Sequence, residues 1–187
     1  MGTITIKDVQ IIMTQPAGSR LIIVKLITSE PGLYGLGCAT FTQRFNAVHT
    51  AIERHLKPFL IGREVDRIEE IYQMSCVHSY WRNGPVLNNA ISGVDQALWD
   101  IKGKRAGMPV YQLLGGKCRE AAACYAHAGG STPEEVVNSI RSFMDQGYRY
   151  IRVQQGGYGG VPSQEVRPEG SPEGAYYDPR EYVRNHL

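Results

Sequence analysis

The sequence lacks the features that mark membrane-spanning, exported or nucleic-acid-binding proteins. Its longest apolar runs, such as residues 21–24, are far shorter than the roughly 20 residues that span a bilayer. Lys7, Asp8 and Gln10 interrupt any signal-peptide-like apolar segment near the N-terminus. The formal net charge is only +2, and the basic residues form no stripe of the kind that nucleic acid requires. We therefore expect a cytoplasmic protein that binds neither membranes nor nucleic acid.

Local metal and phosphate motifs are also missing. The four cysteines include no C-x-x-C pair, so we expect free thiols rather than disulfides or a zinc site. The histidines show neither H-E-x-x-H nor H-x-x-x-H spacing. The GGYGG segment at residues 156–160 lacks the lysine of a P-loop and the register of a dinucleotide-binding turn. The sequence therefore predicts no metal-ligating residues and no phosphate-binding loop.

The first 117 residues have the pattern of an α+β unit. Residues 3–13, 21–28 and 33–42 are β-branched or punctuated by glycine, with turn residues between them, and predict an antiparallel meander of three strands. A helix is predicted over residues 45–56. A second helix should follow Asp66, whose spacing to Glu69 fits a capping box.

A third, longer helix is predicted from the apolar residues that recur three and four positions apart over residues 87–101. Asp100 and Lys104 are placed to pair across one turn of this helix. The Gly-Met-Pro sequence at residues 107–109 should end it. This part of the chain is long enough to bury a core of its own.

From residue 118 the pattern changes to alternating strands and helices. Residues 121–128 predict a strand that ends at His127, and residues 148–154 predict another. Between them, Thr132 as N-cap, Pro133 and Glu135 predict the start of a helix that runs to about residue 146. This order is typical of a parallel βαβ series. Residues 155–175 are rich in glycine and proline and predict a long loop, and another helix could begin near residue 179.

Two stretches, AISGVDQALWDIKGK at residues 90–104 and MPVYQLLGG at residues 108–116, resemble the mandelate racemase and muconate cycloisomerase branch of the enolase superfamily. Residues 35–40, 80–86, 125–127 and 152–154 are similar to D-mannonate dehydratases and their starvation-sensing relatives. The resemblance implies an α+β capping domain over residues 1–117. It implies the first βα units of an incomplete (β/α) barrel over residues 118–187.

The implied activity is that of a magnesium-dependent sugar-acid dehydratase, a lyase. In such enzymes a base removes the proton α to the substrate carboxylate, Mg²⁺ stabilises the enediolate, and a general acid assists departure of the 3-hydroxyl. The partner expected is therefore a small-molecule sugar acid, and the full-length enzyme is expected to be a homo-oligomer. Two alternatives stay open: another racemase or cycloisomerase reaction of this branch, and a non-catalytic fragment that binds a partner or a sugar acid.

The resemblance also implies roles for four residues. His127 matches a histidine that contacts substrate, and Arg152 matches an arginine that lowers the pKa of a catalytic tyrosine. That tyrosine should follow twelve residues later, where Gln164 stands, so Tyr158 is the candidate base. Thr42 stands where the dehydratases usually have a substrate-binding asparagine. These two departures leave the identity of the sugar acid open. Residues 81–83 lie on a predicted loop that could border the substrate pocket.

The strands that carry the three magnesium-binding carboxylates in this family are the third to the fifth of the barrel. A full barrel takes about 250 residues, whereas 70 residues follow residue 117. We therefore expect that the chain alone is inactive, with its Mg²⁺ ligands elsewhere. Because an open pair of parallel strands leaves edges and an apolar face uncovered, we also expect the second part to be poorly stable on its own.

Overall fold

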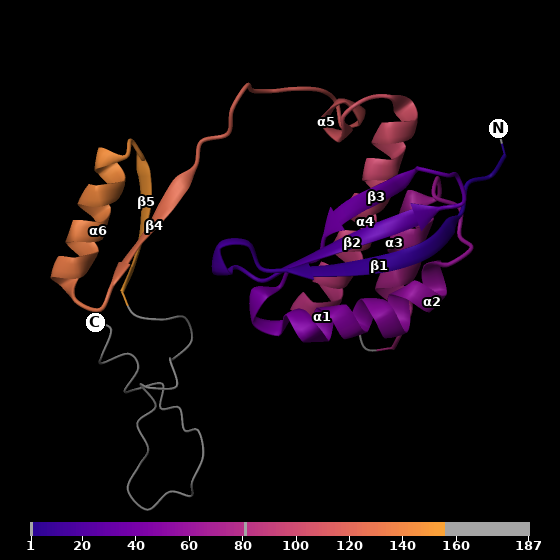
Figure 1. The fold of residues 1–187 in the computed structure, drawn as a ribbon, viewed down its shortest axis with the longest axis horizontal. Helices are drawn as coiled ribbons and strands as arrows, with labels where there is room; N and C mark the ends of the chain where they lie inside the picture. The colour runs from indigo at the N-terminus through magenta and orange to yellow at the C-terminus, as the bar shows by residue number, and fades with distance from the viewer. Residues whose placement is uncertain (1, 81, 156–187) are drawn as a thin grey trace, which may run out of the picture. The chain divides into compact units, whose positions relative to one another are not determined.

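The computed structural model describes residues 2–80 and 82–155. They fall into two compact units, which we call unit 1 (residues 1–118) and unit 2 (residues 119–187) (Figure 1). Unit 1 contains an antiparallel sheet in the order β1 (Ile6–Thr14), β2 (Leu21–Thr28) and β3 (Tyr34–Cys38). The predicted three-stranded meander is thus confirmed.

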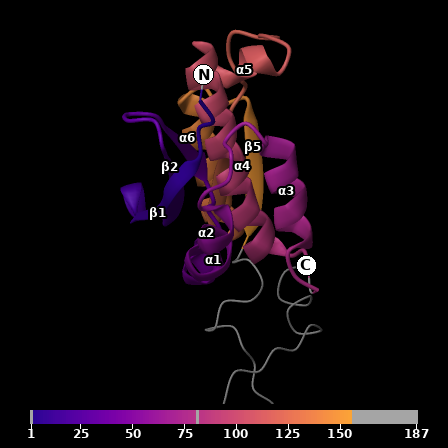
Figure 2. The ribbon, with the colours of Figure 1, turned by 90° about the vertical axis from the view of Figure 1, so that its right-hand side faces the viewer.

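The helices of unit 1 cover one face of this sheet (Figure 2). The helices in contact with the sheet are α1 (Phe45–Ala51), α2 (Lys57–Leu60) and α4 (Pro85–Ala106), while α3 (Ile68–Val77) and the short α5 (Val110–Leu113) pack on α4. A single π-helical segment, Ile52–Leu56, joins α1 to α2. It ends two residues before Pro58, which lacks the N–H that a regular α-helical ladder would use. The helix predicted over residues 45–56 thus continues to Leu60, and its π-helical middle is wider than an α-helix.

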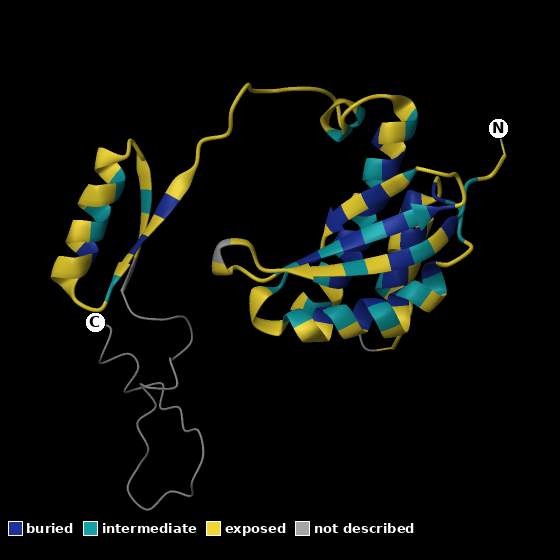
Figure 3. Cartoon of the chain, in the orientation of Figure 1, coloured by how far each residue is buried: buried dark blue, intermediate teal, exposed yellow. Residues whose placement is uncertain are grey.

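The core of unit 1 lies between the sheet and these helices (Figure 3). Along β2 every second side chain is buried, as the twofold period of a strand requires, and α4 supplies the facing apolar stripe. Fully buried members from the two sides include Val24, Leu26, Leu98 and Ile101. No helix in the described part of the chain is both long enough and apolar enough to cross a membrane.

The α4 helix packs unusually close to β3 because glycines line the contact. A methyl group on Gly35 would overlap the Ala97 carbonyl, and one on Gly37 would overlap the Gly93 carbonyl. Gly93 is equally confined, since a Cβ there would lie 2.6 Å from the Ala39 side chain. Helix and strand backbones therefore touch directly along this seam.

Two side chains of α4 also bind the backbone of β3, the edge strand of the sheet. The Asp100 carboxylate accepts a hydrogen bond from the Leu36 N–H at 2.8 Å, and Gln96 Oε1 accepts one from the Cys38 N–H at 3.1 Å. Lys104 donates to Asp100 at 2.7 Å, which confirms the predicted pair, and to the Tyr34 carbonyl at 2.8 Å. Much of the sequence motif at residues 90–104 thus has a packing role.

Several predicted boundaries in unit 1 were wrong. The β3 strand ends at Cys38, because the Thr40 hydroxyl accepts from the Ile22 N–H where a longer strand would place a backbone carbonyl. Asp66 forms no capping box: it binds Lys102 and Arg105 of α4 instead, and α3 begins after Arg67 with no side-chain cap. Ion pairs with two residues distant in sequence thus take the place of the predicted capping contact.

Unit 2 contains β4 (Tyr125–Gly130), α6 (Pro133–Asp145) and β5 (Tyr150–Gln155), and the two strands pair in parallel, as predicted. The Thr132 hydroxyl accepts from the Glu135 N–H at 3.2 Å, which confirms the predicted N-cap. The predicted strand over residues 121–128 begins only at Tyr125, because the four residues before it have no ladder partner.

Candidate functional site

The two strands of unit 2 place His127 and Arg152 directly opposite each other. His127 pairs in register with Arg152, one step after the pair Ala126 and Ile151. Ala126 and Ala128 are buried, whereas His127 between them is exposed. Since side chains alternate across a strand, His127 and Arg152 share the face opposite to the buried alanines. The strands thus bring together two of the four residues singled out by sequence.

The His127 ring also stacks on the neighbouring Tyr125 ring, with centroids 5.0 Å apart and planes 27° from parallel. The β4 strand continues for three residues beyond His127 to Gly130, so His127 does not end the strand as predicted. Paired strands lie about 4.8 Å apart, so an imidazole and a guanidinium on this face can reach one small anion. A guanidinium suits a carboxylate because it can donate two parallel hydrogen bonds to it.

The other two predicted site residues lie elsewhere. Thr42 begins a single 3₁₀ turn, Thr42–Arg44, in unit 1, where it is exposed and its hydroxyl lies 3.0 Å from Gln43 Oε1. Tyr158 lies outside the described residues, as do Gln164, the predicted loop and the predicted helix near residue 179.

The donor set for a magnesium ion can be tested on the described residues. Mg²⁺ in proteins is held mainly by carboxylate oxygens and water in octahedral geometry. Residues 2–80 and 82–155 contain no group of three or more His, Cys, Asp or Glu side chains that could hold a metal ion. This part of the chain therefore does not fit as a magnesium site.

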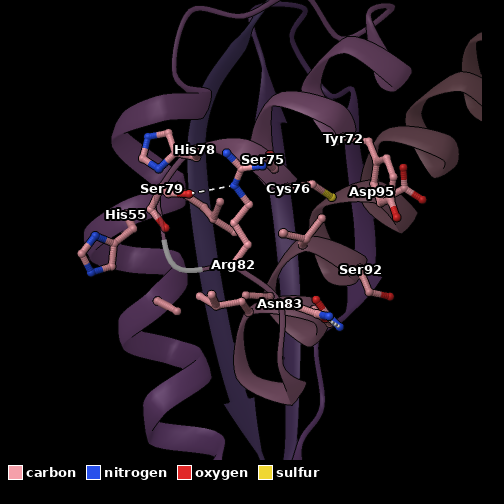
Figure 4. A pocket seen from close by; sticks show the side chains of 16 residues that line it. His55, Tyr72, Ser75, Cys76, His78, Ser79, Arg82, Asn83, Ser92 and Asp95 are labelled. Atoms are coloured by element: carbon pink, nitrogen blue, oxygen red, sulfur yellow. Dashed lines mark hydrogen bonds between the residues drawn. The ribbon is translucent and has the colours of Figure 1, made fainter.

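Unit 1 contains a separate cavity of about 670 Å³ between α1, its π-helical extension, α3 and α4 (Figure 4). We call it the α3–α4 cavity. Its walls are apolar at Leu56, Leu87 and Ile91. Polar side chains also line it: His55, Tyr72, Ser75, Cys76, His78, Ser79, Arg82, Asn83, Asn88, Ser92 and Asp95. Of the predicted pocket-bordering loop, Arg82 and Asn83 line this cavity, and residue 81 lies outside the described residues.

Charge is distributed unevenly around the α3–α4 cavity. Burial raises the pKa of the Asp95 carboxyl, and the negative charge of Glu69 raises it further. Sequence reasoning missed Asp95 and Ser75, because both stand on helices whose apolar periodicity points to packing. Each residue interrupts an apolar stripe, and this could have marked it as a candidate. Ser75 follows Ile68 and Ile71 on α3, and Asp95 lies beside Val94 on α4.

An antiparallel sheet covered by helices, followed in the chain by a parallel βαβ unit, is the arrangement expected of the N-terminal half of an enolase-superfamily protein. The family model described as "Mandelate racemase / muconate lactonizing enzyme, N-terminal domain" matches residues 3–115. The chain therefore belongs to this family of the enolase superfamily and contains its N-terminal domain, which confirms the resemblance seen in the sequence.

Named relatives sharpen this assignment. A "D-galactonate dehydratase family member" from Enterocloster bolteae is 57% identical over 187 residues, covering 98% of this chain and 46% of the relative. The "D-galactonate dehydratase family member RspA" of Pantoea ananatis is 51% identical over 202 residues. A crystal structure of an enolase from Pantoea ananatis with bound D-gluconate and Mg matches with a TM-score of 0.81 and 51% identity, over 97% of this chain and 48% of that one. The chain thus spans about half the length of these relatives.

Proposed function

We propose that this chain is the N-terminal part of a sugar-acid dehydratase. The observation that carries the proposal is the 51% identity, over 97% of the chain, to a structure that binds D-gluconate, a sugar acid. The names of the curated relatives point to the same class of substrate. The parallel pair of strands supports it, because (β/α) barrels place their active sites at the C-terminal ends of their parallel strands.

In this proposal His127 and Arg152 act on the substrate from the uncovered face of β4 and β5. The Arg152 guanidinium supplies positive charge beside the proton-abstracting tyrosine, and a nearby positive charge lowers the pKa of a phenol. Tyr158 is our candidate for that tyrosine. His127 donates a hydrogen bond to a hydroxyl or carboxylate oxygen of the acid. Thr42 of the capping domain is proposed as a further substrate contact through its hydroxyl.

Among the described residues, His127, Arg152 and Thr42 are proposed to act on the substrate, and no group of three or more metal-binding side chains is present, so no step of the reaction is assigned to a metal held by them. D-mannonate, D-gluconate and D-galactonate are all candidate substrates. Thr42 and the tyrosine position set this protein apart from the mannonate dehydratase pattern and are our reason to test all three acids.

A chimera tests the proposal. Residues 1–187 would be joined to the remaining half of the Enterocloster bolteae relative, whose matched half is 57% identical. We expect Mg²⁺-dependent loss of water from at least one of the three acids, measured as the 2-keto-3-deoxy acid product. A folded chimera that dehydrates none of them contradicts the proposal, and epimerisation without loss of water favours the racemase alternative.

Single substitutions in the chimera then test the assigned residues. His127→Asn and Arg152→Gln should each lower kcat/KM by about a hundredfold or more, since general acid–base groups and their partners contribute about 10²–10⁴-fold. His49→Asn is the matched control, because His49 lies on α1 and outside both candidate sites. Activity retained in both the His127 and Arg152 variants refutes their roles.

A further inference from the structure

The α3–α4 cavity lies within unit 1 and shares no residue with the proposed dehydratase site. Its volume, about 670 Å³, falls within the roughly 300–1,000 Å³ of small-molecule sites. Like those sites, it combines an apolar wall with polar side chains that line the same space. The charges of those polar groups indicate what it can hold.

The Ser75 hydroxyl lines the cavity and has no hydrogen-bond partner among the described residues. Ser75 is 8% exposed, and none of the hydrogen bonds among the described residues involves its side chain. A helical serine commonly donates to the carbonyl four residues earlier, yet Ser75 does not. The described residues include no fully buried side-chain N or O atom without a hydrogen-bond partner. The Ser75 hydroxyl is therefore accessible from the cavity, where a bound ligand can form a hydrogen bond with it.

One side of the cavity is rich in cationic or hydrogen-donating groups. Arg82 donates from Nε to the Ser79 carbonyl at 3.1 Å, and no carboxylate among the described residues pairs with its guanidinium. His55 and His78 lie on the same side (Figure 4), and neither forms an ion pair with a described residue. This side therefore offers several N–H donors to an anionic group.

The opposite side of the cavity carries acidic groups. Figure 4 shows Asp95 and Tyr72 across the cavity from His55. Asp95 is half-buried, and the ion pairs among the described residues include none to it. Burial and the negative charge of the nearby Glu69 both disfavour ionisation of Asp95. A cation bound here would offset both effects and favour the ionised carboxylate.

We propose that the α3–α4 cavity binds a small zwitterion, with its carboxylate at Arg82 and its ammonium group at Asp95. The apolar side chains of Leu56 and Ile91 would cover the stem between the two groups. Arg82 precedes α4, whereas Asp95 lies ten residues after Pro85, or about 15 Å along the helix axis. The Arg82 side chain covers part of that length. The two charges of the ligand are therefore several bonds apart, unlike those of an α-amino acid.

The test uses the ¹⁵N-labelled 187-residue chain and three probes: 6-aminohexanoate, hexanoate and hexylamine. We expect 6-aminohexanoate to shift the amide signals of cavity-lining residues and to bind about tenfold more tightly than either single-charged probe, a difference of about 1.4 kcal/mol. Equal affinities for 6-aminohexanoate and hexanoate overturn the proposal. So do shifts confined to residues outside the cavity.

Two variants locate the ends of the ligand. Asp95→Asn should weaken 6-aminohexanoate about tenfold and leave hexanoate unchanged, whereas Arg82→Gln should weaken both. Arg54→Gln is the matched control: Arg54 is exposed next to His55 but does not line the cavity. If Arg54→Gln weakens binding as much as Arg82→Gln, the assignment is wrong.

The same spectra reveal a competing occupant. If cavity signals shift on raising the protein concentration without a probe, a second copy of the chain fills the cavity, and the zwitterion proposal fails. This binding assay needs no turnover, so its failure leaves the dehydratase proposal untouched, and failure of the chimera assay leaves the cavity proposal untouched.

Discussion

Replacing Gly37 by alanine would place a methyl group inside the backbone of α4. That carbon would lie 1.9 Å from the Gly93 oxygen and 2.8 Å from the Ala97 nitrogen. Both are backbone atoms, so no side-chain rotation can make room. Ordinary contact begins at 3.4 Å, and 3.4 − 1.9 leaves 1.5 Å to be gained by moving the helix away from the strand.

A displacement of that size is costly because α4 carries much of the core. It would lift Val94, Leu98 and Ile101 away from the sheet. Overpacking by single methyl groups costs about 1–3 kcal/mol, and the gaps opened along α4 add to it. We expect a loss of about 3 kcal/mol or more from a total of about 5–15 kcal/mol. Backbone entropy alone has the opposite sign, since alanine in place of glycine stabilises by up to about 1 kcal/mol.

Urea unfolding, followed by far-ultraviolet circular dichroism, measures this difference in the free energy of unfolding. The matched control is Leu36→Ala on the same strand, where the side chain is 42% exposed and the expected loss is below about 1 kcal/mol. If Gly37→Ala unfolds at the same urea concentration as the unaltered chain, the close approach of α4 to β3 is not required. If Leu36→Ala is equally damaging, the strand rather than the seam is the sensitive feature.

Three further predictions concern charge and stability. Hydrogen bonds from Arg105 and Lys102 lower the pKa of Asp66, so its contribution is full above its ordinary pKa of 3.8 and disappears as pH falls through the lower folded value. In thermal unfolding, Asp66→Asn should therefore cost up to about 1 kcal/mol at pH 7, where Asp66 and its two partners are partly exposed, and progressively less as pH falls through the folded pKa. Burial raises the pKa of Asp95, so the stability linked to its protonated form is lost as pH rises through the folded value. Asp95→Asn should then be at least as stable as the unaltered chain at pH 7, and a clear loss in thermal unfolding contradicts this. Amide hydrogen exchange should be faster throughout residues 119–155 than in the core of unit 1, because only Ala126, Ala128 and Val136 are buried hydrophobics there; strong protection in the isolated monomer refutes it.

The sequence predicts those elements whose periodicity and packing agree. The β2 strand alternates between buried and half-buried side chains, and α4 repeats its apolar residues at helical spacing, so both could be located from residue order. Asp66 shows where this reasoning fails. Its local spacing favours a cap, but Lys102 and Arg105, which lie 36 and 39 residues away, bind it in the fold. No local pattern reports such a partner.

The two candidate sites also differ in how far the sequence could predict them. The sequence placed His127 and Arg152 on two parallel strands, but only the register of the fold sets them directly opposite each other on one face. The α3–α4 cavity could not be foreseen, because His55, Ser75 and Asp95 come from three helices. Only the packing of those helices brings them around one space.

The seam between α4 and β3 also determines how the sheet of unit 1 can grow. Gln96 and Asp100 use the outward-facing N–H groups of β3 that an added strand would need. At the other edge, residues 62–65 cover the start of β1 through Ile6. The second half of β1 pairs with β2 on its inner side, but no backbone group among the described residues pairs with its outer side. Within the described sheet of unit 1, edge-to-edge strand addition is therefore expected at residues 11–14 rather than at β3.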